Sequence, residues 1–157
     1  MMKIQTAQEY LAIIRMPLQQ LLPLGLRLWV ANVFFFAGLN KYQSWDTTMM
    51  LFEYEYAVPY LAPDIAAWLG TFGELFFPVL LVLGLGGPIA AISLFFVNLI
   101  AVLSYPDISA AGMQQHYLWG LMLMVLAVYG NGQITLDRII QKLYIDKLYA
   151  KLNTGRV

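Results

Sequence analysis

Hydrophobic positions along the chain gather into four long runs, separated by polar stretches and turn residues. Each run approaches the ~20 residues with which a helix crosses a ~30 Å hydrocarbon layer, although the third and fourth are marginal. The turn sequence GLGGP at 84–88 predicts that the second and third helices form an antiparallel hairpin. The four predicted membrane helices cover residues 21–39, 65–85, 88–105 and 110–130.

Two further segments mix apolar and charged residues. Residues 42–64 are too apolar for a plain loop and too short and charged to span, so we expect an interfacial or re-entrant segment there. From Thr135 onward, the pattern predicts an amphipathic helix, lying either on an anionic membrane surface or against the other helices. The predicted fold is all-α: an integral membrane four-helix bundle with these two additions.

Composition supports this interpretation, because 61% of the 157 residues are hydrophobic and 11% are charged, whereas soluble domains have about 25% charged residues. The net charge is zero, so the sequence has no charge signal for nucleic-acid binding. The absence of cysteine excludes disulfides, thiol catalysis and cysteine-ligated metals. Since the chain also has one histidine, we expect no metal site.

Basic residues gather near both ends of the chain, and residues 42–64 contain acidic residues without Lys or Arg. The positive-inside rule therefore places both termini in the cytoplasm. We expect a cytoplasmic N-terminal segment at 1–20, a transmembrane domain at 21–134 and a cytoplasmic tail at 135–157. The first apolar run lacks a clean cleavage site and contains Arg27, which favours a retained helix over a signal peptide.

Arg27, Asn32, Glu74 and Asn98 are predicted at membrane depth, where a charge costs at least ~2.5 kcal/mol unless it has a partner or water. A helical rise of ~1.5 Å per residue puts Glu74 and Asn98 near one level, within reach of the long Arg27 side chain. We therefore expect Glu74 to contact Arg27, Asn98 or both. Such a cluster would either fix the helix arrangement or form a ligand or proton site.

Helical spacing gives each predicted membrane helix one inward face, in which small residues allow close packing. Lys41, at the end of the first face, is expected to extend to the membrane surface. The four faces are Arg27, Ala31, Phe34, Gly38 and Lys41; Gly70, Glu74, Pro78 and Leu81; Leu94, Asn98 and Ala101; and His116, Gly120, Leu123 and Ala127.

His116 precedes Trp119 by one helical turn at the outer end of the fourth run. One alternative is a functional residue that hydrogen-bonds a quinone head group or relays a proton. The other is an interfacial residue that only begins the helix. The sequence has no nucleophile–base set and no dinucleotide fingerprint, so we do not expect an autonomous enzyme.

Several stretches together resemble the DoxX family: LRLWVANVFFFAGLNKYQSWD, VPYLAP, GTFGELFFPVLLVLGLGGPIAA and HYLWGLMLMVLAVYGNGQITLD. They fall within about residues 24–138. The chain departs from the family pattern by lacking a basic residue near Gly87 or Pro88. The residues that match the family pattern are Arg27, Gly38, Lys41, Trp45, Glu74, Gly84 and Gly86.

The resemblance implies a multi-pass protein of the bacterial inner membrane. It further implies an accessory subunit or scaffold of an oxidoreductase or of a copper-binding modified-peptide system, in which no cofactor is certain and a quinone is the candidate. The alternatives are a quinone-binding redox component and a small transporter or chaperone for an apolar solute. Expected partners are the bilayer and a protein of those systems, and the Gly/Ala-rich faces would also allow a homodimer. The candidate polar or ligand-binding cluster is Arg27, Lys41, Trp45, Glu74, Asn98, His116 and Trp119.

Overall fold

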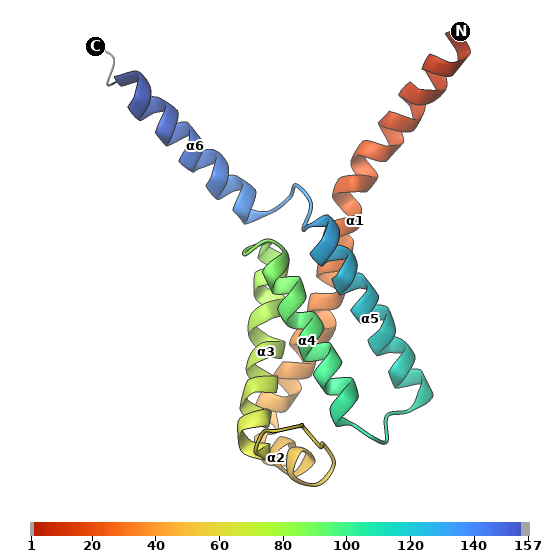
Figure 1. The fold of residues 1–157 in the computed structure, drawn as a ribbon, viewed down its shortest axis with the longest axis vertical. Coiled ribbons are helices and arrows are strands. Elements are labelled where there is room, and N and C mark those ends of the chain that lie inside the picture. The colour runs from red at the N-terminus through yellow and green to blue at the C-terminus, as the bar shows by residue number, and fades with distance from the viewer. Residues whose placement is uncertain (1, 155–157) are drawn as a thin grey trace.

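The protein is all-helical in its computed structural model, with no strand in residues 2–154 (Figure 1). The structure describes the backbone of these residues and the side chains of residues 11, 13 and 15–147. The six helices are α1 (Met2–Gln43), α2 (Trp45–Tyr54), α3 (Pro63–Leu83), α4 (Pro88–Ser104), α5 (Ala110–Tyr129) and α6 (Leu136–Thr154).

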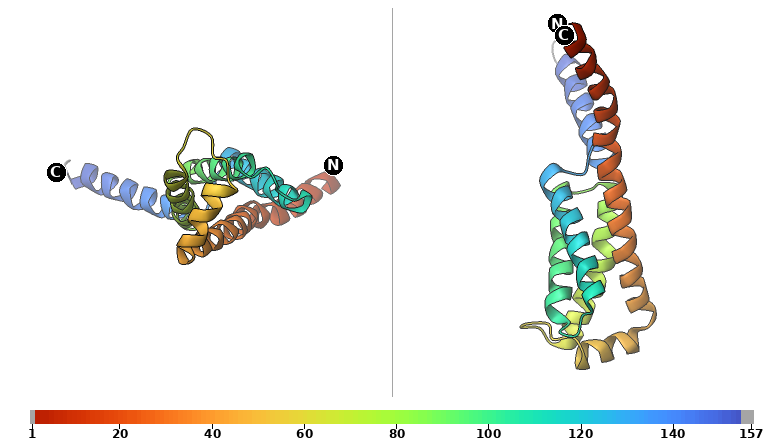
Figure 2. Two further views of the ribbon diagram at one scale, coloured as in Figure 1. Left: turned by 90° about the horizontal axis from the view of Figure 1, so that it is seen from below. Right: turned by 90° about the vertical axis from the view of Figure 1, so that its right-hand side faces the viewer.

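Helices α1, α3, α4 and α5 lie side by side (Figures 1 and 2). Helix α1 packs on α3 and α5, and α4 also packs on α3 and α5. Helix α2 lies across one end of this group, while the N-terminal part of α1 and the whole of α6 project from the other end. The polar groups discussed below therefore lie between the four packed helices or at their ends.

The predicted helices at 65–85, 88–105 and 110–130 are confirmed to within two residues at each end. Helix α1 is much longer than the predicted 21–39 and continues through Pro17 and Pro23, across the domain boundary expected at residue 20. Within the described residues, two segments are long and apolar enough to cross a membrane, Arg15–Gln43 and Pro63–Leu83. Helix α4 is apolar but shorter.

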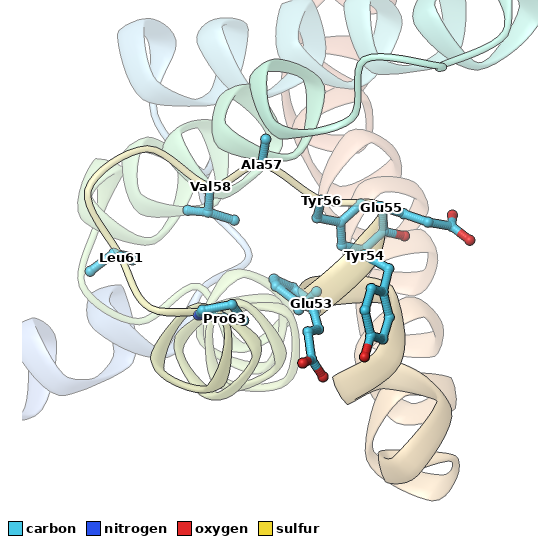
Figure 3. Close-up of a pocket in the computed structure, with 9 residues that line it drawn as sticks. Glu53, Tyr54, Glu55, Tyr56, Ala57, Val58, Leu61 and Pro63 are labelled. Atoms are coloured by element: carbon cyan, nitrogen blue, oxygen red, sulfur yellow. The ribbon is translucent and has the colours of Figure 1, made fainter.

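The expected interfacial or re-entrant segment contains helix α2 and an irregular loop over residues 55–62. Phe52 on α2 packs against Ala66 and Ala67 near the start of α3. The loop borders a cavity of about 340 Å³ and returns to Pro63 (Figure 3). Because α2 lies across the helix ends rather than among the packed helices, the re-entrant alternative is not confirmed.

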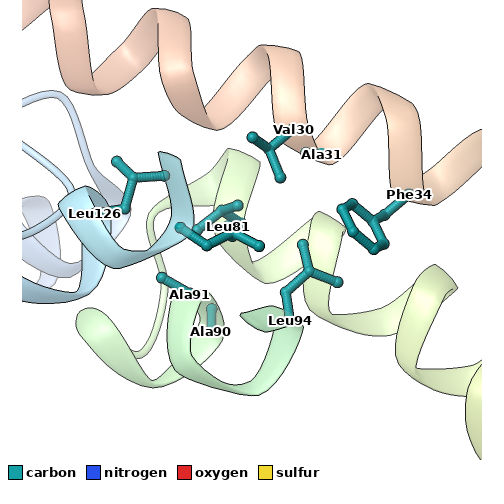
Figure 4. Close-up of a cluster of buried hydrophobic side chains, with 9 residues drawn as sticks. Val30, Ala31, Phe34, Leu81, Ala90, Ala91, Leu94 and Leu126 are labelled. Carbon is teal, nitrogen blue, oxygen red and sulfur yellow. The ribbon is translucent and has the colours of Figure 1, made fainter. Parts of the chain in front are cut away.

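The hydrophobic core lies where the four packed helices meet (Figure 4). Phe34 on α1, Leu81 on α3, Leu94 on α4 and Leu123 on α5 are all almost completely buried. These residues belong to the four inward faces predicted from helical spacing, so the predicted faces are confirmed. Their packing brings polar residues of the same faces into contact.

The predicted hairpin of the second and third membrane helices is confirmed as α3–turn–α4. Gly84 follows α3 in the left-handed region with φ 65°, a conformation that favours glycine. Its N–H donates to Leu81 O at 3.2 Å, and the Leu85 N–H donates to Leu80 O at 2.9 Å. This pattern is a Schellman motif, which satisfies the carbonyls at the end of α3.

Helix α6 confirms the predicted C-terminal helix but does not pack along the others. Its apolar side chains Ile139, Ile140 and Leu143 are all more than half exposed. The alternative of a helix packed against the bundle is therefore wrong for the described part of α6. The membrane-surface alternative stays a prediction.

Candidate functional site: paired polar groups between the helices

Lys41 on α1 and Glu74 on α3 form an ion pair between neighbouring helices. The Lys41 Nζ donates to Glu74 Oε1 at 2.7 Å and to Oε2 at 2.6 Å. The Glu74 side chain is only 9% exposed and that of Lys41 is 21% exposed. The pair therefore supplies the compensating charge that a carboxylate inside an apolar protein requires.

A glycine makes this pairing possible. A Cβ added to Gly38 would lie 2.9 Å from Glu74 Cβ and 3.1 Å from the Glu74 backbone carbon. These distances are shorter than ordinary van der Waals contact, so a side chain at residue 38 would push α1 and α3 apart. Gly38 thereby lets the two helices approach closely enough for Lys41 to reach Glu74.

The predicted contact between Arg27 and Glu74 is wrong, as is the expectation that Lys41 extends away to the membrane surface. Arg27 precedes Lys41 by fourteen residues on α1, which is about 21 Å at 1.5 Å per residue. A helix that places Lys41 on Glu74 therefore carries Arg27 to the other end of α3. The prediction failed because hydrophobic spacing gives the face of a helix but not its axial register against a neighbour.

Arg27 instead binds the C-terminal end of α3 and the segment before α6. It is 1% exposed, and its Nη2 donates to Ile134 O at 2.7 Å. Its Nη1 lies 3.5 Å from both Leu81 O and Val82 O. A guanidinium at this position adds a donor to the carbonyls at the C-terminal end of α3 and opposes the negative end of the helix dipole.

Two polar residues that the sequence analysis did not single out complete this end of the molecule. The Gly87 N–H donates to Asp137 Oδ2 at 2.7 Å, and Asn131 Nδ2 donates to Gly87 O at 2.7 Å. Both contacts connect the α3–α4 turn to the chain around the start of α6. The Asn and Asp of the GNGQITLD stretch, close to a predicted helix end, were the only available signal for them.

Asn98 on α4 and His116 on α5 form a second polar pair. The Asn98 Nδ2 donates to His116 O at 3.0 Å, and Asn98 Oδ1 lies 2.8 Å from His116 Nδ1. The second contact is a hydrogen bond in the tautomer that carries its proton on Nδ1. Asn98 is thus paired with His116 rather than with Glu74, and the amide holds the imidazole in a fixed orientation.

One aromatic ring, that of Trp119, packs on His116 along α5 and contacts a second ring on α1. Trp119 meets the His116 ring edge to face, with centroids 4.9 Å apart, and Phe34 meets Trp119 at 5.7 Å. Gly120 faces Asn98, since a Cβ at residue 120 would lie 3.3 Å from the amide nitrogen. His116, Trp119 and Asn98 therefore form one packed group, which the sequence did not predict, since Asn98 was expected to contact Glu74.

Trp45 lies apart from these polar pairs, at the end of the molecule where α2 begins. Its ring lies 4.4 Å from that of Trp68 on α3, measured between centroids. In the same region Tyr56 packs edge to face on Phe52 and on Tyr105. Burial raises the pKa of the Tyr56 phenol, and the negative potentials of Tyr105, Glu55 and Glu74 raise it further.

Two cavities of about 340 Å³ each lie on the surface of the described structure, one bordered by the 55–62 loop and one between α1 and α3. Neither is lined by Glu74, Asn98 or His116. The described residues contain no group of three or more His, Asp or Glu placed to hold a metal ion. The charged and hydrogen-bonding site residues thus form three separate sets of contacts. Lys41 pairs with Glu74, Asn98 pairs with His116, and Arg27 binds carbonyls at the end of α3 and in the segment before α6.

These features define an all-α protein with membrane-type apolar helices held together by buried polar pairs. The sequence model of the DoxX family matches residues 22–106, more than half of the chain, so the protein belongs to the DoxX family. That range includes Lys41 and Glu74, which form the ion pair, Gly38, which lies against Glu74, and Arg27, which binds the far end of α3. Comparisons with curated proteins and with solved structures found no match.

Proposed function

We propose that this protein is an integral membrane accessory subunit that crosses the bacterial inner membrane with α1, α3, α4 and α5 and assembles with a redox or metal-peptide partner. Its membership of the DoxX family and the apolar helices support insertion into a membrane. Large apolar side chains are exposed along the outer faces, including Phe72, Phe76, Ile100 and Leu121. Such surfaces are rare on soluble monomers and suit contact with lipid.

The proposed orientation puts both termini in the cytoplasm. Both ends of the described chain project from the same end of the packed helices, as an even number of crossings requires (Figure 1). The basic residues near the two ends, against the acidic 42–64 segment, favour this side for the termini. Helix α2 and the 55–62 loop then face the periplasmic side.

The observation that carries the accessory role is the pairing of the polar groups at membrane depth within the chain itself. Glu74 is neutralised by Lys41, and Asn98 is bonded to His116. Groups that bind each other in this way fix the helix arrangement and present a rigid body to a partner.

The proposed contact surface for that partner is the end formed by α2 and the 55–62 loop. Tyr54 is 75% exposed and Tyr60 is fully exposed. Tyr60 also has φ 64°, a strained conformation for a residue with a side chain. Tyrosine is enriched at protein interfaces, so a contact with a partner would use both rings.

The experiment isolates the tagged protein from its native membrane in a mild detergent and quantifies co-purifying proteins, lipids and quinones. The Tyr54→Ala/Tyr60→Ala double variant should lose its partner, with the captured amount falling at least tenfold, as expected when interface tyrosines are removed. The matched control is Tyr129→Ala, which removes an equally exposed ring at the other end of the molecule. Equal capture by all three proteins would refute the proposed contact surface.

The His116 environment favours a second candidate, a quinone-binding redox component. Asn98 engages the Nδ1 atom of a half-buried imidazole that also lies against Trp119. In that tautomer the Nε2 atom carries a lone pair, so it can accept a hydrogen bond from the hydroxyl of a reduced quinone, and only the protonated imidazolium can donate to a quinone carbonyl. Added quinone should raise the melting temperature of the purified protein, His116→Gln should abolish the shift, and Tyr117→Phe should not. The absence of a shift with several quinones would remove this candidate.

A further inference from the structure

Asn32 is a polar residue in an otherwise apolar groove on the outer surface. The groove lies between α1 and α3, encloses about 340 Å³ and is open on one side. Leu28 and Phe36 of α1 border it on one side, and Val79 and Val82 of α3 border it on the other. Asn32 is the only residue lining the groove whose side chain can hydrogen-bond.

The position of this amide is unfavourable for an isolated molecule in a bilayer. Asn32 follows Leu21, the start of the predicted span, by eleven residues, which puts it about 16 Å into the membrane. Its side chain is exposed, and none of the hydrogen bonds among the described residues involves it. Lipid chains offer no donor or acceptor, so an amide there lacks the partner that a polar group in hydrocarbon requires.

The contrast with the other polar groups at membrane depth makes Asn32 distinctive. Arg27, Glu74 and Asn98 are buried, and each has a hydrogen-bond partner within the chain. Asn32 lies on the opposite side of α1 from the Arg27 face. No side chain among the described residues pairs with it, which leaves its amide open to a second molecule.

We propose that this groove is a homodimer interface in which Asn32 of one copy hydrogen-bonds Asn32 of a second copy. An amide is both donor and acceptor, so two copies related by a twofold axis can form two equivalent N–H···O bonds. Polar side chains of this kind promote association of membrane helices. The exposed Leu28 and Phe36 would pack beside the amides and remove apolar surface from lipid contact.

This interface is independent of the proposed accessory role, because it uses the lipid-facing side of α1 and α3 rather than the α2 end. The chain contains no cysteine, so oxidative cross-linking reports only on cysteines that are introduced. The probe is Leu28→Cys, one turn from Asn32 on the groove. The matched control is Leu99→Cys, which places a thiol on the outward side of α4.

Oxidation in native membranes should cross-link Leu28→Cys into a homodimer and leave Leu99→Cys monomeric. Adding Asn32→Leu to the Leu28→Cys chain should weaken dimerisation about tenfold, the loss expected for an interhelical amide bond. Asn32→Gln, which retains the amide, should keep more dimer than Asn32→Leu. Melting temperatures of the single variants verify that each remains folded.

Three outcomes would overturn the proposal. Equal cross-linking at residues 28 and 99 would indicate random collision. Cross-linking unaffected by Asn32→Leu would exclude the amide contact. A monomer that loses a co-purifying lipid or other amphiphile on Asn32→Leu would assign the groove to that molecule instead of a second copy.

Discussion

Lys41, near the C-terminal end of α1, binds both carboxylate oxygens of Glu74, which lies in the middle of α3, at 2.7 and 2.6 Å. The contact neutralises the carboxylate in the apolar run GTFGELFFPVLLVLGLG and fixes the register of α1 against α3. Gly38, one turn before Lys41, provides the close helix approach that the contact needs. The pair is therefore the main polar link between these two helices among the described residues.

Replacing either member of the pair should destabilise the protein. Glu74→Gln leaves the Lys41 ammonium without its counter-charge, and breaking a buried ion pair in this way costs about 3 kcal/mol or more. The measurement is the unfolding free energy in detergent with increasing SDS, followed by circular dichroism. Glu53→Gln, at an exposed position on α2, should change stability by less than about 0.5 kcal/mol.

A double variant tests whether the effect comes from the pair. Lys41→Met/Glu74→Met removes both charges and should recover much of the stability that each single variant loses. Additive losses in the double-variant cycle would show that the two side chains act independently and would contradict the assigned contact.

Gly38→Ala should separate α1 from α3. Its added methyl group would lie 2.9 Å from Glu74 Cβ and 3.0 Å from Leu75 Cγ, and overpacking of this type costs about 1–3 kcal/mol. Gly25→Ala, in the same helix with no neighbouring atom within 4 Å, should instead stabilise by up to about 1 kcal/mol. Thermal melting of both variants is the measurement, and a lower melting temperature for Gly25→Ala than for Gly38→Ala would refute the assignment.

Asp137→Ala should release the segment between α5 and α6 from the α3–α4 turn. It removes the hydrogen bond from the Gly87 N–H at 2.7 Å, and bonds to charged groups contribute about 1.5–3 kcal/mol. Limited trypsin digestion should then cleave after Arg138 several times faster than in the unmodified protein. Asp146→Ala, exposed on the same helix, is the control and should leave the cleavage rate unchanged.

The raised pKa of Tyr56 predicts a loss of stability at alkaline pH. Burial raises the pKa above the ordinary value of 10.0, so the phenol stays neutral in the folded protein after it ionises in the unfolded chain. This contribution to stability is complete below about pH 10 and decreases as the pH rises toward the folded-state pKa. Melting temperatures from about pH 8 to 11 should fall less steeply for Tyr56→Phe than for the control Tyr60→Phe, and equal slopes would contradict the prediction.

The helices were largely predictable because their signals are local. Long apolar runs and the glycine-rich turn at 84–88 gave α3, α4 and α5 to within two residues. The N-terminal extension of α1 was missed because the prediction followed the apolar run alone, whereas α1 continues into the more polar residues before it and through Pro17 and Pro23. A proline inside a helix removes one backbone hydrogen bond, and the remaining bonds sustain the helix here.

The candidate site was predictable as a set of residues but not as a set of pairs. Arg27, Lys41, Glu74, Asn98 and His116 were all placed correctly on inward faces, since a period of 3.6 residues determines the face. The partner of each residue depends on how far one helix is shifted along its neighbour. That shift follows from close contacts such as Gly38 against Glu74, and the linear pattern contains no measure of it.

The sequence by itself determined that the chain is helical, which residues face inward, and that the second long apolar helix carries a carboxylate that needs a polar partner. Those features follow from residue type and spacing along one chain segment. Only the tertiary structure decided that Lys41 is that partner, that Arg27 binds the carbonyls at the far end of α3, and that Asn131 and Asp137 hold the turn at Gly87. These contacts join residues from 33 to 107 positions apart, so they depend on the packing of whole helices rather than on local preference.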